Sequence, residues 1–311
     1  MKKLTSLIIS GLLLLSILIM VNPILGATHH IYPGDDIESI IEGAGAGDTI
    51  YIHAGTYYPL DNITINNDNI TIIGDSPFNT IIDASSAGNG LEGGNARYIT
   101  IKNITIRNAP QNRSGFDLYA DNTLENCIAY NNGNIGFDIG DRGMAKNCLA
   151  YDNGGTGFNS IMEGTFINCT SAKNGYDGFY EQDTQANSIN CIAYGNSNYG
   201  FSERVITDYC NAFDNTVGNY EDSMGLGSIS SDPKFVTGRL GDYYLEYSSP
   251  CVDSGSAQST ALDLYNGLTT RTDEKWDKGT VDMGFHYASN RGPTGSIPIM
   301  KILEILKKNK N

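Results

Sequence analysis

Two aspartates in the middle of the chain are the residues best suited to do chemistry. Asp117 and Asp138 each follow a Gly-Phe dipeptide and lie 21 positions apart. If that spacing is one structural repeat, the two carboxylates face outward on adjacent strands, about 4.8 Å apart. Carboxylates this close either share a proton or hold a cation, and calcium favours oxygen ligands. We therefore take Asp117 and Asp138 as candidate calcium ligands.

The same carboxylates could instead catalyse hydrolysis of a glycosidic bond, which needs a pair of acidic side chains. Asp117, Asp138 and Asp177 are the candidate catalytic residues, although the position of Asp177 ahead of a Gly-Phe does not place it on the same face. A third interpretation is an acidic, solvated face that keeps the protein soluble. The sequence leaves these three interpretations open.

Three tyrosines form a candidate binding stripe. Tyr130, Tyr151 and Tyr194 each lie three residues after a Cys. Strand alternation points them outward, where aromatic rings can stack on sugar rings. We predict that they bind substrate, with stacking between neighbouring strands as the structural alternative.

These candidates must be positioned by a repeat of about 21 residues. Each repeat contains short stretches of alternating side chains and Asn/Gly turns, and shows no helical periodicity. Such a repeat predicts one coil of a parallel β-helix, an all-β solenoid whose Cys and Phe residues form interior ladders. The repeated dipeptides are Asn126-Cys127, Asn147-Cys148, Asn168-Cys169 and Asn190-Cys191, together with Gly115-Phe116, Gly136-Phe137, Gly157-Phe158, Gly178-Phe179 and Gly200-Phe201.

The start of the repeat region contains a short helix signal. Asp36 precedes the apolar residues Ile37, Ile40 and Ile41, and a Gly-rich stretch begins at Gly43. An Asp cap followed by an apolar stripe predicts a helix over residues 36–43, which would cover the open end of the solenoid. We expect the cysteines to be free thiols stacked in the core, with disulfides as the alternative.

Charge and the two chain ends limit the class of protein. With 20 Lys and Arg against 35 Asp and Glu, the net charge of −15 argues against nucleic-acid binding. Residues 1–27 resemble a signal peptide, with an uncleaved membrane anchor as the alternative. Residues 28–290 form the predicted β-helix domain with a C-terminal cap. Residues 291–311 are a linker and a short basic amphipathic tail that either seals the last coil or contacts a membrane or the cell envelope.

Several motifs carry a family resemblance. The opening Pro33-Gly34-Asp35-Asp36 and the C-terminal Asp282-Met283-Gly284-Phe285 resemble right-handed parallel β-helix proteins of the pectate-lyase-like superfamily. The resemblance covers about residues 30 to 288. Within that superfamily, the Asn-Cys and Gly-Phe coils are most similar to polysaccharide lyase family 9.

That family implies a calcium site and a lysine base, which this chain matches only in part. Ser114 replaces the first acid, Asn134 and Ile135 replace a pair of acids, and only Asp138 matches. The residue after Gly-Phe that should be the lysine is Asn159. These departures favour a non-catalytic protein, with a divergent polysaccharide lyase or glycoside hydrolase as the alternative.

We therefore expect a secreted or cell-surface β-helix protein that interacts with an extracellular polysaccharide, with calcium as its cofactor. Neither His53 nor His286 has sequence neighbours typical of a metal ligand or a catalytic triad.

Overall fold

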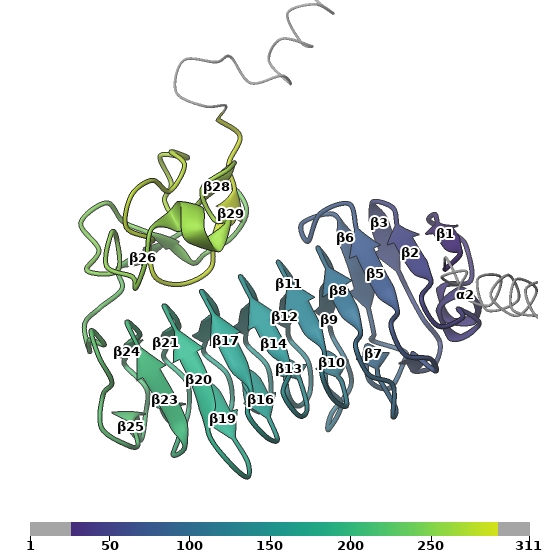
Figure 1. The fold of residues 1–311 in the computed structure, drawn as a ribbon, viewed down its shortest axis with the longest axis horizontal. Helices are drawn as coiled ribbons and strands as arrows, with labels where there is room; N and C mark the ends of the chain where they lie inside the picture. The colour runs from purple at the N-terminus through teal and green to yellow at the C-terminus, as the bar shows by residue number, and fades with distance from the viewer. Residues whose placement is uncertain (1–25, 292–311) are drawn as a thin grey trace, which may run out of the picture.

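The computed structural model describes residues 26–291, which form an all-β solenoid followed by an irregular C-terminal region (Figure 1). Three parallel sheets run along the solenoid, and neighbouring strands in each sheet come from successive coils. A coil therefore contributes one strand to each sheet. The predicted parallel β-helix is confirmed.

We call these the first, second and third sheets. The first contains β1 (Thr28–Ile31), β2 (Thr49–Ile52), β5 (Thr71–Gly74), β8 (Thr100–Lys102), β11 (Thr123–Glu125), β14 (Met144–Lys146), β17 (Thr165–Ile167), β20 (Ala186–Ile189) and β23 (Val205–Asp208). The second contains β3 (Gly55–Tyr57), β6 (Thr80–Asp83), β9 (Thr105–Arg107), β12 (Ile128–Tyr130), β15 (Leu149–Tyr151), β18 (Thr170–Ala172), β21 (Ile192–Tyr194) and β24 (Asn211–Phe213). The third contains β4 (Ile63–Thr64), β7 (Leu91–Glu92), β10 (Phe116–Asp117), β13 (Phe137–Asp138), β16 (Phe158–Ser160), β19 (Phe179–Glu181), β22 (Tyr199–Phe201) and β25 (Gly218–Tyr220).

The Asn-Cys dipeptides make the bend between the first and second sheets. Their asparagines have φ angles of 50–56°, in the left-handed region that asparagine tolerates better than most residues. The cysteine that follows each of them points into the solenoid and is fully buried. All six cysteines, Cys251 included, are free thiols. The predicted ladder of stacked thiols is confirmed.

The phenylalanines of the Gly-Phe dipeptides form a second interior ladder, on the inner face of the third sheet. The rings of Phe116, Phe137, Phe158, Phe179 and Phe201 stack in sequence, with centroids 4.8–5.0 Å apart. This spacing is that of neighbouring strands, so each ring packs on the one in the next coil. The residue after each Phe consequently points outward.

The N-terminal end is covered as predicted. Helix α2 spans Ile37–Glu42, and the side chain of Asp36 caps it by accepting a hydrogen bond from the backbone N–H of Ser39. Ile37 and Ile41 are buried against the first coils.

The sequence predicted that the C-terminal region would cap the end of the solenoid. Residues 232–291 instead lie against its side (Figure 1). This region contains the hairpin of β26 (Phe235–Val236) and β27 (Tyr244–Leu245), the 3₁₀ helix Ser259–Leu262, and the hairpin of β28 (Leu268–Thr269) and β29 (Tyr287–Ala288).

Asparagines of the Asn-Cys bends bind the C-terminal region to the solenoid. The Asn147 side chain accepts a hydrogen bond from the backbone N–H of His286 and donates one to its carbonyl. The Asn168 side chain donates to the carbonyl of Asp282, and the Asn190 side chain accepts from the N–H of Ser256. The same residues therefore shape the coil and hold the region that covers it.

Two predicted segments fall outside this description. The predicted signal peptide (1–27) lies outside the described residues except at its end, and so does the tail (291–311) except for Arg291. Over residues 26–291, no helix has the length and apolar character needed to cross a membrane.

Candidate functional site

Three carboxylates lie side by side on the outer face of the third sheet. Asp117 of β10 pairs in register with Asp138 of β13 on one side and with Glu92 of β7 on the other. The predicted adjacency of Asp117 and Asp138 is confirmed. Glu92 was not predicted, because the coil between Glu92 and Asp117 has 25 residues and breaks the 21-residue spacing. The sequence feature that Glu92 shares with the two aspartates is the apolar residue before it. Leu91 precedes Glu92 as Phe116 precedes Asp117. We call Glu92, Asp117 and Asp138 the acid ladder.

The surroundings of Asp117 and Asp138 favour the protonated, neutral forms of these two carboxyl groups. Burial raises the pKa of Asp138 to about 6, and the neighbouring charge of Asp117 adds to the effect. Burial also raises the pKa of Asp117, as does the charge of Glu92. Asp117 accepts a hydrogen bond of 2.8 Å from the amide of Asn89, and Glu92 accepts one of 2.7 Å from the amide of Asn62.

No basic side chain neutralises the ladder directly. Within residues 26–291, none of the three carboxylates forms an ion pair with Lys or Arg. Arg113 lowers the pKa of Asp117 only through its more distant charge. Adjacent carboxylates without a bound counter-charge are a suitable donor set for a hard divalent cation such as calcium.

Asn159 occupies the position at which the family resemblance implies a lysine base. This position is next to the acid ladder, and its side chain is an amide. Asn159 of β16 pairs in register with Asp138, and Tyr180 of β19 pairs with Asn159. Neither side chain is the lysine that the resemblance implies at this position, and an amide is not a general base near neutral pH.

Asp177 does not join the acid ladder. It precedes Gly178 on the coil of Tyr180, two coils beyond Asp138. Its carboxylate accepts hydrogen bonds from the Asn198 side chain at 2.7 Å and the backbone N–H of Tyr199 at 2.9 Å. Asp177 is thus a buried turn residue, and the structure does not bring it to the other two candidates.

The three tyrosines of the predicted stripe line up on the second sheet, but the C-terminal region packs against them. The rings of Tyr130 and Tyr151 stack with centroids 4.8 Å apart. Tyr151 also packs on Tyr243 at 5.4 Å, and Tyr194 packs edge-on against Phe235 at 5.4 Å. The expectation of an exposed stripe is corrected, because aromatic residues of the C-terminal region cover it. Their role in substrate binding stays a prediction that this packing does not favour.

An exposed aromatic residue lies next to the acid ladder instead. Tyr119, two residues after Asp117, is 38% exposed, and the guanidinium of Arg97 lies 5.2 Å from its ring centroid. Arg97 and Arg142 both pair with Asp121, at 3.3 Å and 2.8 Å. An aromatic ring therefore lies two residues from Asp117, and two guanidinium groups lie around Asp121, four residues from Asp117.

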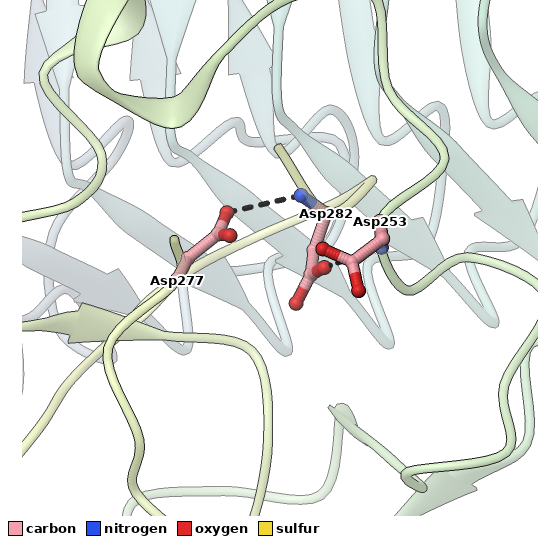
Figure 2. Close-up of side chains that lie close together, drawn as sticks. All are labelled: Asp253, Asp277 and Asp282. Atoms are coloured by element: carbon pink, nitrogen blue, oxygen red, sulfur yellow. Dashed lines mark hydrogen bonds between the residues drawn. The ribbon is translucent and has the colours of Figure 1, made fainter. Parts of the chain in front are cut away.

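A second group of acids lies in the C-terminal region. Figure 2 shows Asp253, Asp277 and Asp282, which each offer an oxygen within 4.8 Å of the others. Asp277 accepts hydrogen bonds from His286 and from the backbone N–H of Asp282, and Asp282 accepts one from the N–H of Asp253. Protein donors thus already bind the carboxylates of Asp277 and Asp282, which join separate segments of the region. His286, which has no sequence pattern typical of a metal ligand or a catalytic triad, is buried with its Nε2 2.8 Å from the carboxylate of Asp277.

The fold and the ladder place this chain among parallel β-helix proteins. The profile of the Pel9A-like, right-handed β-helix region matches residues 28–223. The chain therefore belongs to the Pel9A-like right-handed β-helix family, which confirms the predicted handedness and the predicted resemblance.

Solved structures with a similar fold have low sequence identity. Pectate lyase Pel9A is 14% identical, with 75% of this chain and 92% of that chain covered and a TM-score of 0.46. The A-module of mannuronan C-5 epimerase AlgE4 from Azotobacter vinelandii is 18% identical, with 58% and 73% covered and a TM-score of 0.39. ORF18 of Geobacillus virus E2 is 17% identical over 57% of this chain, which spans 42% of that chain, with a TM-score of 0.45. No curated protein matches the chain significantly.

Proposed function

We propose that this protein is exported and binds an acidic extracellular polysaccharide through calcium held by Asp117 and Asp138, without cleaving the chain. The observation that carries the proposal is the acid ladder, whose carboxylates lie in register with no Lys or Arg ion pair among the described residues. A calcium ion there would retain coordination positions for the carboxylates of a uronate polymer. Membership of the Pel9A-like family supports a glycan as the ligand.

The residues beside the ladder suit the same ligand. Tyr119 offers a ring on which a sugar can stack. Arg97 and Arg142 offer guanidinium groups that can bind uronate carboxylates. A polymer lying across the third sheet would thus meet calcium, an aromatic ring and cations in turn.

The side chain next to the site supports binding without cleavage. Elimination from a uronate requires a base that removes a proton from carbon, and Asn159 stands beside Asp138 where the related lyases have a lysine.

Hydrolysis is the second candidate function, and the pKa of Asp138 favours it. A carboxyl with a pKa of about 6 next to a second carboxyl is the arrangement that a general acid needs. In that case Asp138 would donate the proton and Asp117 would act as nucleophile or base.

The test is binding of polygalacturonate by affinity electrophoresis, with calcium or with a chelator. We expect calcium-dependent retardation of the wild-type protein, and affinity reduced roughly tenfold or more in Asp117→Asn and Asp138→Asn. Asp183→Asn, which removes an exposed acid from a turn of the same solenoid, is the matched control. Retardation that is unchanged by chelator and by both variants would contradict the proposal.

Product analysis of the same mixtures separates binding from catalysis. Unsaturated uronate absorbance would indicate elimination, and new reducing ends without that absorbance would indicate hydrolysis. Either product, lost in Asp138→Asn, would replace the non-catalytic proposal with the corresponding enzyme activity.

A further inference from the structure

Three of the four histidines in the chain lie on two adjacent strands, β1 and the end of β2. His30 of β1 pairs in register with Tyr51 of β2, and His53 follows β2 directly. His30 and His53 both lie on the outer face of the first sheet. Their ring nitrogens, Nδ1 of His30 and Nε2 of His53, are 3.1 Å apart.

Neighbouring side chains hold these two rings in place. Tyr32 stacks on His53 with centroids 4.3 Å apart and planes 13° from parallel. Tyr51 lies beside His30 at 5.4 Å. The strand pairing positions His30 and Tyr51 directly, and a 2.9 Å hydrogen bond from the backbone N–H of His53 to the carbonyl of Ile31 continues it.

Asp75 orients His53. Its carboxylate lies 3.6 Å from Nδ1 of His53 and is itself fixed by a 2.8 Å hydrogen bond from the backbone N–H of Ala54. A carboxylate on that side favours the tautomer with hydrogen on Nδ1, which leaves the lone pair of Nε2 directed toward His30.

We propose that His30 Nδ1 and His53 Nε2 bind one divalent transition-metal ion such as Zn²⁺, Ni²⁺ or Cu²⁺. Two imidazole nitrogens on one tetrahedral ion at the usual bond lengths stand roughly 3.3 Å apart, close to the spacing found here. In the absence of the ion, a hydrogen bond joins the same two atoms. Metal binding breaks this hydrogen bond, and His30 shifts its proton from Nδ1 to Nε2, so that both nitrogens offer a lone pair to the ion. Water or an external carboxylate completes the coordination.

This site is chemically distinct from the acid ladder. Imidazole nitrogens favour transition metals, whereas carboxylates favour calcium. His29 does not contribute, because its Nε2 bonds the carboxylate of Asp48 at 2.9 Å. The sequence around His53 showed no pattern typical of a metal ligand, and the tertiary structure places His30, Tyr32 and Asp75 around it.

The experiment is calorimetric titration of the full chain with Zn²⁺ in buffer containing excess calcium, which occupies carboxylate sites. We expect one Zn²⁺ per chain in the wild-type protein. His30→Ala and His53→Ala should each weaken binding at least tenfold, and Asp75→Asn should weaken it about tenfold through His53. His29→Ala, which removes a neighbouring histidine bonded to Asp48, should bind like the wild-type protein.

Two further readouts keep the result interpretable. Circular dichroism of each variant checks that the fold is intact. The electron paramagnetic resonance spectrum of bound Cu²⁺ should show hyperfine coupling to two imidazole nitrogens, and to one in either single variant. Folded His30→Ala and His53→Ala proteins that bind Zn²⁺ like the wild-type protein would overturn the proposal, and so would equal loss in His29→Ala.

Discussion

Asp117 and Asp138 are neighbours because a parallel ladder brings residues of the same register together, coil after coil. The alternation that buries Phe116 and Phe137 turns both carboxylates outward. Partial burial of these carboxylates then raises both pKa values, so the electrostatic property of the site follows from its place in the repeat.

The raised pKa of Asp138 predicts a stability that depends on pH. Its pKa of about 6 in the folded protein exceeds the ordinary value of 3.8, so the folded state binds this proton more tightly than the unfolded chain does. The resulting stabilisation is present below about pH 4 and is lost as the pH rises through about 6. In chelator at pH 7, Asp138→Asn should therefore raise the free energy of unfolding by on the order of 2–3 kcal/mol.

Thermal and urea unfolding at pH 4 and pH 7 check this prediction. The gain from Asp138→Asn should be smaller at pH 4, and Asp183→Asn should show no such difference between the two pH values. A gain of equal size at both pH values would contradict the assigned cause.

At the scale of elements, the Asn-Cys bends have two roles. The asparagine adopts a left-handed backbone conformation that allows the sharp turn between sheets. In three successive coils its side chain also binds the C-terminal region, through Asn147, Asn168 and Asn190. A residue that looks like a simple repeat marker is thus a long-range contact as well.

Glycine substitutions can separate these two roles. Asn147→Gly keeps the left-handed conformation accessible but removes both side-chain bonds to His286, at 2.6 Å and 3.0 Å. Asn126→Gly makes the same change one coil earlier, where the side chain bonds only Asn103 and Asn147.

We expect Asn147→Gly to lower the free energy of unfolding by about 2–4 kcal/mol, since two buried backbone groups lose their partners. Asn126→Gly should cost less, and only Asn147→Gly should speed proteolysis within residues 232–291. Equal costs and equal proteolysis in the two variants would show that the bend alone matters.

At the scale of the whole molecule, the C-terminal region and the two proposed sites lie on different parts of the solenoid surface. The region packs on outward-facing residues of the second sheet, among them the tyrosine stripe. The proposed sites lie elsewhere, with the acid ladder and Tyr119 on the third sheet and His30 and His53 at the N-terminal end of the first sheet.

The phenylalanine ladder along the third sheet should dominate the stability of the solenoid. Phe179 is fully buried and contacts Phe158, Phe166 and Phe201 at 4.8–5.4 Å. Phe179→Ala should lower the free energy of unfolding by about 3–5 kcal/mol, because it leaves a cavity between two coils. Tyr180→Ala changes the next residue on the same strand, which faces outward, and should cost less than about 1 kcal/mol.

Chemical denaturation of both variants, followed by circular dichroism, gives the two costs. Similar values would mean that the interior stack contributes no more than the outer face of the strand.

The regular spacing of the repeats made much of this fold and part of its sites predictable. Asn126-Cys127 and its equivalents set the coil, and that spacing alone placed Asp117 beside Asp138. The capping helix at Ile37–Glu42 was equally readable, since an Asp cap and an apolar stripe are local signals. The one matched acid, Asp138, and the missing lysine at Asn159 came from the resemblance to polysaccharide lyase family 9.

What the repeat could not encode was decided by the tertiary structure. Glu92 joined the acid ladder across an irregular coil, and the tyrosine stripe was covered by residues 41 and 92 positions further along the chain. His30 and His53 met because two strands paired in a particular register. Periodicity determines which residues share a face when every coil has the same length. The docking of an irregular segment depends instead on side-chain shape and on hydrogen bonds between residues far apart in sequence, such as Asn147 and His286.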